Sequence, residues 1–142
     1  MTKIDFYSGA DDKLLAACEV CQKVVDSGAR VLLYTPDAAT TIVLDKLLSE
    51  HPATAATAHC CCTDPEIYEM PVVVTHKSQD FPHYEVLINL QSACLPFFSR
   101  FNRVIEIVSL DEADVMAGRE RFGFYRDRGY EIDHKDLTKQ AG

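Results

Sequence analysis

Two arginines and an aromatic side chain recur at helical spacing near the end of the sequence. Arg119, Phe122 and Arg126 share one face of a helix at 100° per residue. Val115 extends that stripe by one turn, and Gly118 lies on its flank. A guanidinium can hold a carboxylate through two parallel hydrogen bonds, and a neighbouring ring supplies apolar contact area. The stripe is therefore typical of a pocket for a ligand that is both anionic and apolar.

Ion pairing within the helix is the alternative explanation of the same arginines. Acidic residues occur throughout this segment, at Asp111, Asp114, Glu120 and Asp127. Pairs between them and the arginines would leave an ordinary solvated face of little energetic value. The spacing alone slightly favours this interpretation. The core face of the helix is expected on roughly the opposite side, at Ala113, Ala117 and Phe124.

Cysteine and histidine could offer a second kind of chemistry, which is zinc binding. Cys18 and Cys21 have Cys-x-x-Cys spacing, and Cys60–Cys62 follow His59. The first pair falls inside a helical pattern instead of a tight turn, and three consecutive residues of a strand alternate between its faces. We therefore expect these cysteines, with Cys94, to pack as small apolar side chains, and we expect no metal. The five histidines are expected near loops and edges, as solvated or capping residues: His51, His59, His76, His83 and His134.

The turn after the first expected strand is where an α/β protein would hold a nucleotide phosphate. Residues 7–12 read Tyr-Ser-Gly-Ala-Asp-Asp, with one glycine, no G-x-G-x-x-G pattern, no P-loop lysine and two acidic groups. No G-x-S-x-G or His-Glu-x-x-His motif occurs. We expect no cofactor. A small nucleotide- or metal-binding enzyme that uses the loops at Ser8–Asp12 and Thr35–Asp37 is kept as the alternative function.

Strands and helices alternate along the first fifty residues. The expected elements are a strand at 3–7, a helix at 12–26 ended by Gly28, a buried strand at 30–34 and a helix that opens at Thr35-Pro36-Asp37 and ends before Pro52. This β-α-β-α order with short connections implies right-handed crossovers and a parallel sheet.

The later elements are shorter, except for the last helix. Further strands are expected at 57–62, 72–75, 85–90 and 103–108. A short helix begins at Leu95, and the last helix covers about 110–127, with Ser109 and Glu112 as a capping box and Gly129 after its end. The fold class predicted is α/β. It is a single three-layer domain over residues 1–142 with a mostly parallel central sheet and a Rossmann-like topology without a nucleotide-binding loop.

Composition limits the classes of partner. The chain has 142 residues and a formal net charge of −8, which opposes binding to a phosphate backbone, so no direct contact with nucleic acid is expected. Six of the seven arginines nevertheless lie between Arg100 and Arg128, an arrangement suited to an acidic protein segment. No apolar run is long enough for a membrane span, and the N-terminus has no signal-peptide pattern. We expect a cytoplasmic protein without membrane contact or a disulfide framework.

Residues 118–130 read Gly-Arg-Glu-Arg-Phe-Gly-Phe-Tyr-Arg-Asp-Arg-Gly-Tyr. This stretch resembles A-R-x-R-x-x-x-Y-R-x-x-G-[FY], the signature of the chi subunit family of the bacterial DNA polymerase III holoenzyme. Residues 86–90, followed by Phe97-Phe98, resemble the family's "LINL…F" segment. Weaker likeness extends to Phe6-Tyr7 and to residues 44–48. It thus touches the whole chain, and the last third is the most specific part.

The resemblance implies a three-layer α/β domain with no catalytic role of its own. The family links the clamp loader, through the psi subunit, to the acidic C-terminal tail of single-stranded-DNA-binding protein, which ends in Pro-Phe with a free carboxylate. The family's tail pocket corresponds here to Val108, Val115, Arg119, Phe122 and Arg126. Because spacing had already selected four of these residues, the two observations together favour partner binding over ion pairing.

The resemblance also implies a role for each residue of this pocket. Arg119 would hold the terminal carboxylate of the tail, and Arg126 would attract the acidic residues upstream of it. The phenylalanine ring would pack against the three apolar residues, Val108, Val115 and Phe122.

The sequence departs from the family pattern at two places. Val115 and Gly123 occupy positions where some members carry lysine, which implies weaker electrostatic attraction of the tail. Ser49 and residues 56–59, Ala-Thr-Ala-His, replace a tryptophan and an F-x-P-H element on the psi-facing side. A psi partner is therefore expected to be absent or engaged differently.

Overall fold

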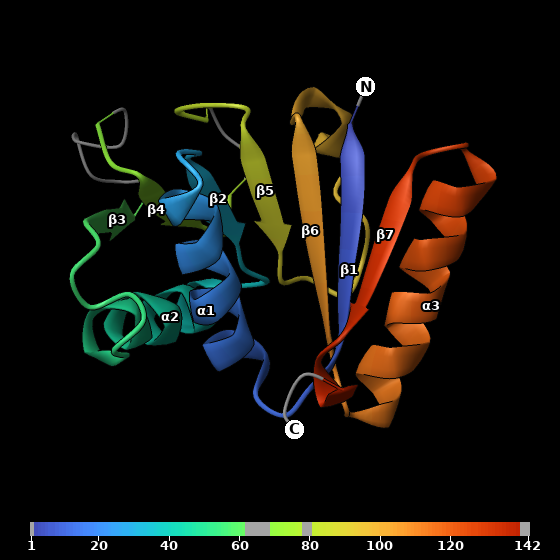
Figure 1. The fold of residues 1–142 in the computed structure, drawn as a ribbon, viewed down its shortest axis with the longest axis horizontal. Helices are drawn as coiled ribbons and strands as arrows, with labels where there is room; N and C mark the ends of the chain where they lie inside the picture. Colours follow the sequence, from blue (N-terminus) through green and yellow to red (C-terminus); the bar gives the residue numbers. More distant parts are fainter. Residues whose placement is uncertain (1, 62–68, 78–80, 140–142) are drawn as a thin grey trace.

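A parallel sheet forms the middle layer of the fold (Figure 1). The computed structural model describes residues 2–61, 69–77 and 81–139. Seven strands are found in these ranges: β1 (Lys3–Ala10), β2 (Val31–Tyr34), β3 (His59–Cys61), β4 (Val72–Thr75), β5 (Val86–Asn89), β6 (Arg103–Ser109) and β7 (Ile132–Asp136). Their order is β3-β4-β2-β5-β6-β1-β7, and each neighbouring pair is parallel. β1 and β2 are thus separated by β5 and β6.

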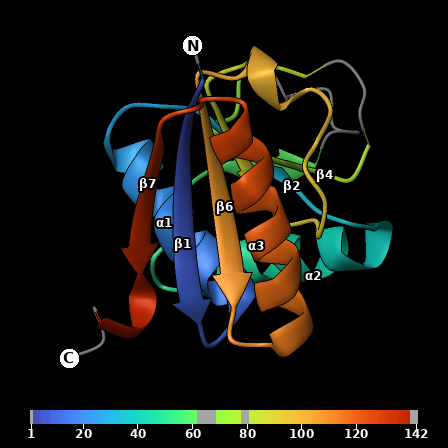
Figure 2. The ribbon, with the colours of Figure 1, turned by 90° about the vertical axis from the view of Figure 1, so that its right-hand side faces the viewer.

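Helices cover both faces of the sheet. α1 (Lys13–Asp26) and α2 (Ala38–Glu50) pack on one face, and α3 (Glu112–Asp127) packs on the other, as Figure 2 shows for α1 and α3. Short 3₁₀ turns follow β5 and β7, at Phe98–Arg100 and Leu137–Lys139. Each face has its own apolar core, one beneath α1 and α2 and one beneath α3. The predicted three-layer α/β fold with a parallel sheet is confirmed.

The first two helices begin where the sequence predicts. The side chain of Asp12 accepts hydrogen bonds from the backbone N–H groups of Leu14 and Leu15, and Asp37 accepts one from Thr40. These carboxylates satisfy N–H groups that have no partner inside the helix. Gly28, with φ of 94°, follows the end of α1 in the left-handed region that glycine adopts without strain.

The strand pattern also matches the prediction in the middle of the sheet. All residues of β2, β4 and β5 are buried, as expected for strands covered on both faces. The strand expected at 57–62 is found as His59–Cys61, and residue 62 lies outside the described ranges. The helix expected to begin at Leu95 is wrong in type and start, because the segment forms only a 3₁₀ turn at Phe98–Arg100.

Two features at the end of the chain differ from expectation. α3 begins at Glu112 with Asp111 as its N-cap, so the capping box predicted for Ser109 and Glu112 is wrong. The backbone N–H of Ser109 instead donates to the carboxylate of Asp114, at 2.7 Å. β7 was not predicted at all. It pairs in parallel with β1 and closes one edge of the sheet next to α3.

Candidate functional site

A pocket of about 320 Å³ opens between α3 and the end of the sheet that contains β1, β6 and β7. Four of the five predicted partner-binding residues line it: Val108, Val115, Arg119 and Phe122. Arg126 is not part of its lining. Its side chain is 66% exposed and pairs with Asp127 at 3.2 Å. The pocket volume lies at the lower end of the range for small-molecule sites, so it suits one side chain of a partner.

Gly118 sets how closely α3 approaches β6. A Cβ atom at this position would lie 2.7 Å from Cγ2 of Val108. Valine is stiff at χ1, so its methyl groups have little freedom to move away. Glycine therefore lets the helix backbone pack directly over Val108, and both residues form part of the pocket wall.

Aromatic packing forms another wall. The rings of Phe122 and Phe6 meet edge to face, with centroids 5.2 Å apart. Phe6 is buried in β1, and its contact fixes the Phe122 ring, which is only half-buried. Spacing along the helix could identify Phe122 but not its partner, because a helical pattern does not reveal which strand the helix covers.

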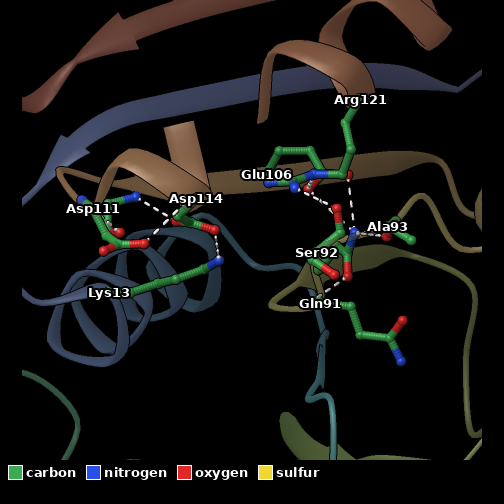
Figure 3. A network of polar contacts seen from close by, with 10 residues as sticks. Lys13, Gln91, Ser92, Ala93, Glu106, Asp111, Asp114 and Arg121 are labelled. Carbon is green, nitrogen blue, oxygen red and sulfur yellow. Dashed lines mark hydrogen bonds and ion pairs between the residues drawn. The ribbon is translucent and has the colours of Figure 1, made fainter. Parts of the chain in front are cut away.

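Arg119 is exposed at this pocket and has no ion-pair or hydrogen-bond partner among the residues that the structure describes. Three of the four acids expected to neutralise it are engaged elsewhere, and the fourth, Glu120, forms no ion pair with it in the described part of the chain. Asp111 caps α3, and Asp114 pairs with Lys13 at 3.0 Å (Figure 3). Asp127 pairs with Arg126. The ion-pair interpretation therefore fits Arg126 and is wrong for Arg119.

Comparison with known proteins establishes the family. The family model "DNA polymerase III chi subunit, HolC" matches residues 1–133. "DNA polymerase III subunit chi" of Pseudomonas aeruginosa is 34% identical over 140 residues, which cover 95% of this chain and 97% of the relative. The chain belongs to the DNA polymerase III chi subunit family.

More distant relatives carry the same name. "DNA polymerase III subunit chi" of Escherichia coli K12 is 25% identical over 133 residues, 93% of this chain and 88% of the relative. That of Haemophilus influenzae is 23% identical over 122 residues, 85% of each chain. As a chi subunit, this chain is a non-catalytic accessory subunit of DNA polymerase III. No helix of its described part is long and apolar enough to cross a membrane.

The inner face of α3 in this chi subunit carries a buried polar network (Figure 3). Arg121 donates through Nε to Glu106 Oε1 at 2.9 Å and through Nη1 to the carbonyl of Ser92 at 2.7 Å. The hydroxyl of Tyr125 donates to Glu106 Oε2 at 2.7 Å, and the amide of Asn89 donates to both carboxylate oxygens. Burial raises the pKa of Glu106, while Arg121, Tyr125 and Asn89 oppose that rise.

This network corrects the predicted core face of α3. The buried residues of the helix are Gly118, Arg121 and Tyr125, whereas Ala113 is exposed and Ala117 and Phe124 are half-buried. A buried arginine contradicts ordinary hydrophobic patterning, because it is tolerated only where a carboxylate pairs with it. The apolar pattern of the helix could not reveal Glu106, which comes from β6.

Sequence reasoning missed three polar residues of the pocket, Ser8, Ser109 and His134. Ser8 belongs to β1 and His134 to the unpredicted β7, and Ser8 Oγ lies 2.6 Å from His134 Nε2. β7 reads Ile-Asp-His-Lys-Asp, which has no alternation of apolar and polar residues, so the sequence of this segment alone does not indicate a strand.

Two of the cysteines considered for zinc binding are buried in the core, and two of the residues considered for nucleotide binding cap a helix. Cys18 and Cys21 are buried in α1, and burial raises the pKa of their thiols to about 11 and about 12, which disfavours the thiolate that binds zinc. No group of three or more His, Cys, Asp or Glu residues suited to a metal occurs in the described ranges. Cys62 lies outside them. In the loops of the alternative function, Asp12 and Asp37 cap helices.

Proposed function

We propose that this chi subunit binds the acidic C-terminal tail of single-stranded-DNA-binding protein and so connects that protein to the DNA polymerase III holoenzyme. One observation carries the proposal. Arg119, a cation without an acidic partner in the described chain, lines a pocket whose other walls are largely apolar. A C-terminal phenylalanine offers a carboxylate and a ring on the same residue, which matches this combination.

The apolar residues account for the ring. Val108, Val115 and Phe122 come from β6 and α3 and converge on one pocket. Burying an aromatic ring from water contributes about 2 kcal/mol. The terminal carboxylate would then lie against Arg119, whose guanidinium can form two parallel hydrogen bonds with it. A contact this small is expected to bind weakly, because the interface must also offset the entropy of ordering the tail.

Arg126 has a different role in this proposal. It lies one and two turns along α3 from Phe122 and Arg119, outside the pocket, and its side chain is largely exposed. We assign it to attraction of the acidic residues upstream of the terminal phenylalanine. Because exposed charges are screened by salt, this contribution is greatest at low ionic strength.

The proposed tail pocket lies near the β7 edge of the sheet and does not involve the opposite edge, at β3. Ser49 lies in α2 and residues 56–59 lead into β3, at the edge opposite β7. These are the positions at which the family pattern has psi-facing aromatic groups. In our proposal a psi subunit would use that edge through other side chains, and the tail and psi would not compete. A replication subunit of this kind is proposed to act in the cytoplasm, without direct contact with DNA.

The test is fluorescence anisotropy of a labelled acidic peptide that ends in Pro-Phe, titrated with this protein at low and moderate salt. We expect saturable binding that disappears when the terminal phenylalanine is deleted. The matched control is the same peptide with its carboxylate amidated, which should bind much more weakly because Arg119 loses its acceptor. No binding at low salt would reject the proposal.

A further inference from the structure

The ionisable side chains among the residues lining the pocket are Arg119 and His134, and no carboxylate is among them. Arg119 comes from α3, while His134 comes from β7 on another side of the pocket. The family model matches residues 1–133, and His134 is the next residue along β7. A pocket that takes a carboxylate therefore contains one permanent cation and one group whose charge depends on pH.

The strand pairing orients His134. It is paired with Phe6 across β1 and β7, and Phe6 packs against Phe122 of α3. Ser8 Oγ contacts His134 Nε2 at 2.6 Å. A hydroxyl can donate to a neutral imidazole or accept from a protonated one, so this contact is kept in either state. Ser8 therefore orients the ring without preventing its protonation.

The other charged groups near His134 face away or have partners. Its neighbours Asp133 and Lys135 point to the opposite face of the strand, where Asp133 pairs with Lys3 and Lys135 contacts the Tyr7 hydroxyl. Asp136 is on the same face as His134, and its carboxylate accepts hydrogen bonds from Thr138.

The elements packed against β7 contribute little further charge. From β1 the pocket receives Phe6, Ser8 and Gly9, and from α3 the ionisable residue is Arg119. The described lining of the pocket thus contains no acid, and the one acid on the strand face of His134, Asp136, lies outside that lining.

We propose that His134 is a second, proton-dependent cationic group of the tail pocket. Protonated His134 acts with Arg119 on the terminal carboxylate of the tail, so the complex is tighter below the pH at which the imidazole loses its proton. This inference rests on the proposed function, because it needs an anionic ligand in the pocket. Histidine is the side chain whose unperturbed charge change falls between pH 5 and 8, so pH 6 and pH 8 are the two values to compare.

The experiment measures the dissociation constant of the Pro-Phe peptide at pH 6 and pH 8 at constant ionic strength. The carboxylates of the peptide are ionised throughout this range, so its charge stays constant. One added charge near a solvent-exposed carboxylate predicts about fivefold tighter binding at pH 6 for the unmodified protein. His134→Gln should bind equally at both values, with the affinity that the unmodified protein shows at pH 8.

Two further variants separate this effect from general titration of the protein. His59→Gln changes a histidine of β3, at the opposite edge of the sheet, and should keep the full pH dependence. His134→Lys should bind with little pH dependence and at least as tightly at pH 8 as the unmodified protein. Thermal unfolding of each variant checks that the fold is retained.

Calorimetry in two buffers of different ionisation enthalpy gives an independent measurement. Between pH 6 and 8, binding should be accompanied by uptake of a fraction of a proton, and His134→Gln should abolish this uptake. Tail binding that depends on Arg119 but is equal at pH 6 and 8, or a pH dependence that survives in His134→Gln, overturns the inference and leaves the proposed function intact. No binding of the peptide at either pH overturns both.

Discussion

Arg119 and Arg121 are separated by a single residue of α3, yet they lie in opposite environments. The guanidinium of Arg121 is on the inner face, where its side chain is 2% exposed and it pairs with a fully buried Glu106. Arg119 is exposed on the pocket side and has no acidic partner among the described residues. Residue type and sequence neighbourhood are almost the same for both, so the difference comes from the strand residues beneath the helix.

The inner side of α3 therefore has a structural role, whereas its pocket side is available for binding. On the inner side, both oxygens of Glu106 accept hydrogen bonds, and the network joins α3 to β6, β5 and the segment after it. Such a network specifies one position of the helix. On the pocket side, a cation and apolar walls remain available to a ligand. The buried network holds α3 in one position, and this position places the pocket-lining residues of its other side.

Replacing Arg121 should have the largest effect. Arg121→Met leaves the carboxylate of Glu106 buried without its cation, and this should lower the free energy of unfolding by about 3–5 kcal/mol. Urea denaturation followed by circular dichroism measures the change. Combining it with Glu106→Gln should recover part of the loss, because the unpaired charge is removed. A loss below about 1 kcal/mol in Arg121→Met would mean that the buried pair does not hold α3.

Replacing Arg119 should affect binding without affecting stability. Arg119→Ala removes the proposed carboxylate contact and should weaken binding of the Pro-Phe peptide by about 2 kcal/mol or more, which is about thirtyfold. The free energy of unfolding should change by less than about 0.5 kcal/mol, since the side chain is exposed. Arg119→Lys is the matched variant, and it should recover only part of the affinity because lysine lacks the planar fork. Unchanged affinity in Arg119→Ala would remove this residue from the site.

Gly118 is buried against β6 and also lines the pocket, so replacing it should affect both stability and binding, with an intermediate effect. Gly118→Ala places a methyl group against Val108, which should cost about 1–3 kcal/mol, while the higher helix propensity of alanine returns up to about 1 kcal/mol. We expect a net loss of stability in thermal unfolding and weaker peptide binding, since α3 must move away from β6. Val108→Ala in the same chain should relieve the contact. A more stable Gly118→Ala protein would contradict this close approach.

Arg126 should show the smallest effect. Its pair with Asp127 is exposed at both side chains, and such pairs contribute between about 0 and 1 kcal/mol. Arg126→Ala should weaken tail binding less than about threefold at moderate salt and somewhat more at low salt. Anisotropy titrations of Arg126→Ala and Arg119→Ala at two salt concentrations compare the residues directly. An equal loss for both would place Arg126 inside the site with Arg119.

Local chemistry explains which parts of the fold could be predicted from the sequence. The elements around α1 and α2 follow from short-range signals, such as Asp12 and Asp37 as caps and Gly28 after a helix. The strands β2, β4 and β5 could be predicted from their short, mainly apolar runs, which are typical of strands buried on both faces. The stripe of Val115, Arg119 and Phe122 is also a local pattern, and four of the five predicted residues line one pocket.

The missed features all depend on contacts between distant segments. Arg121 is buried because Glu106 of β6 lies beneath it, and no pattern within the helix contains that information. β7 is mostly polar and forms by pairing with β1, more than a hundred residues earlier in the chain. His134 could not be assigned to the pocket without that pairing. The predicted N-cap of α3, Ser109, is wrong. The backbone N–H of Ser109 donates to the carboxylate of Asp114 and not to that of Glu112, and Asp111 is the N-cap.

The contact between Ser8 and His134 spans 126 positions of the chain. β7 has no other strand neighbour in the described sheet than β1, so the wall of the pocket that contains His134 forms only when the earliest and latest strands meet. A polypeptide still being synthesised therefore cannot offer this wall to a partner, even when the earlier strands of its sheet have already paired. Loop closure over such a length is slow compared with helix formation. Under the proposed function, only chains whose synthesis has passed β7 can therefore bind the tail through a complete pocket.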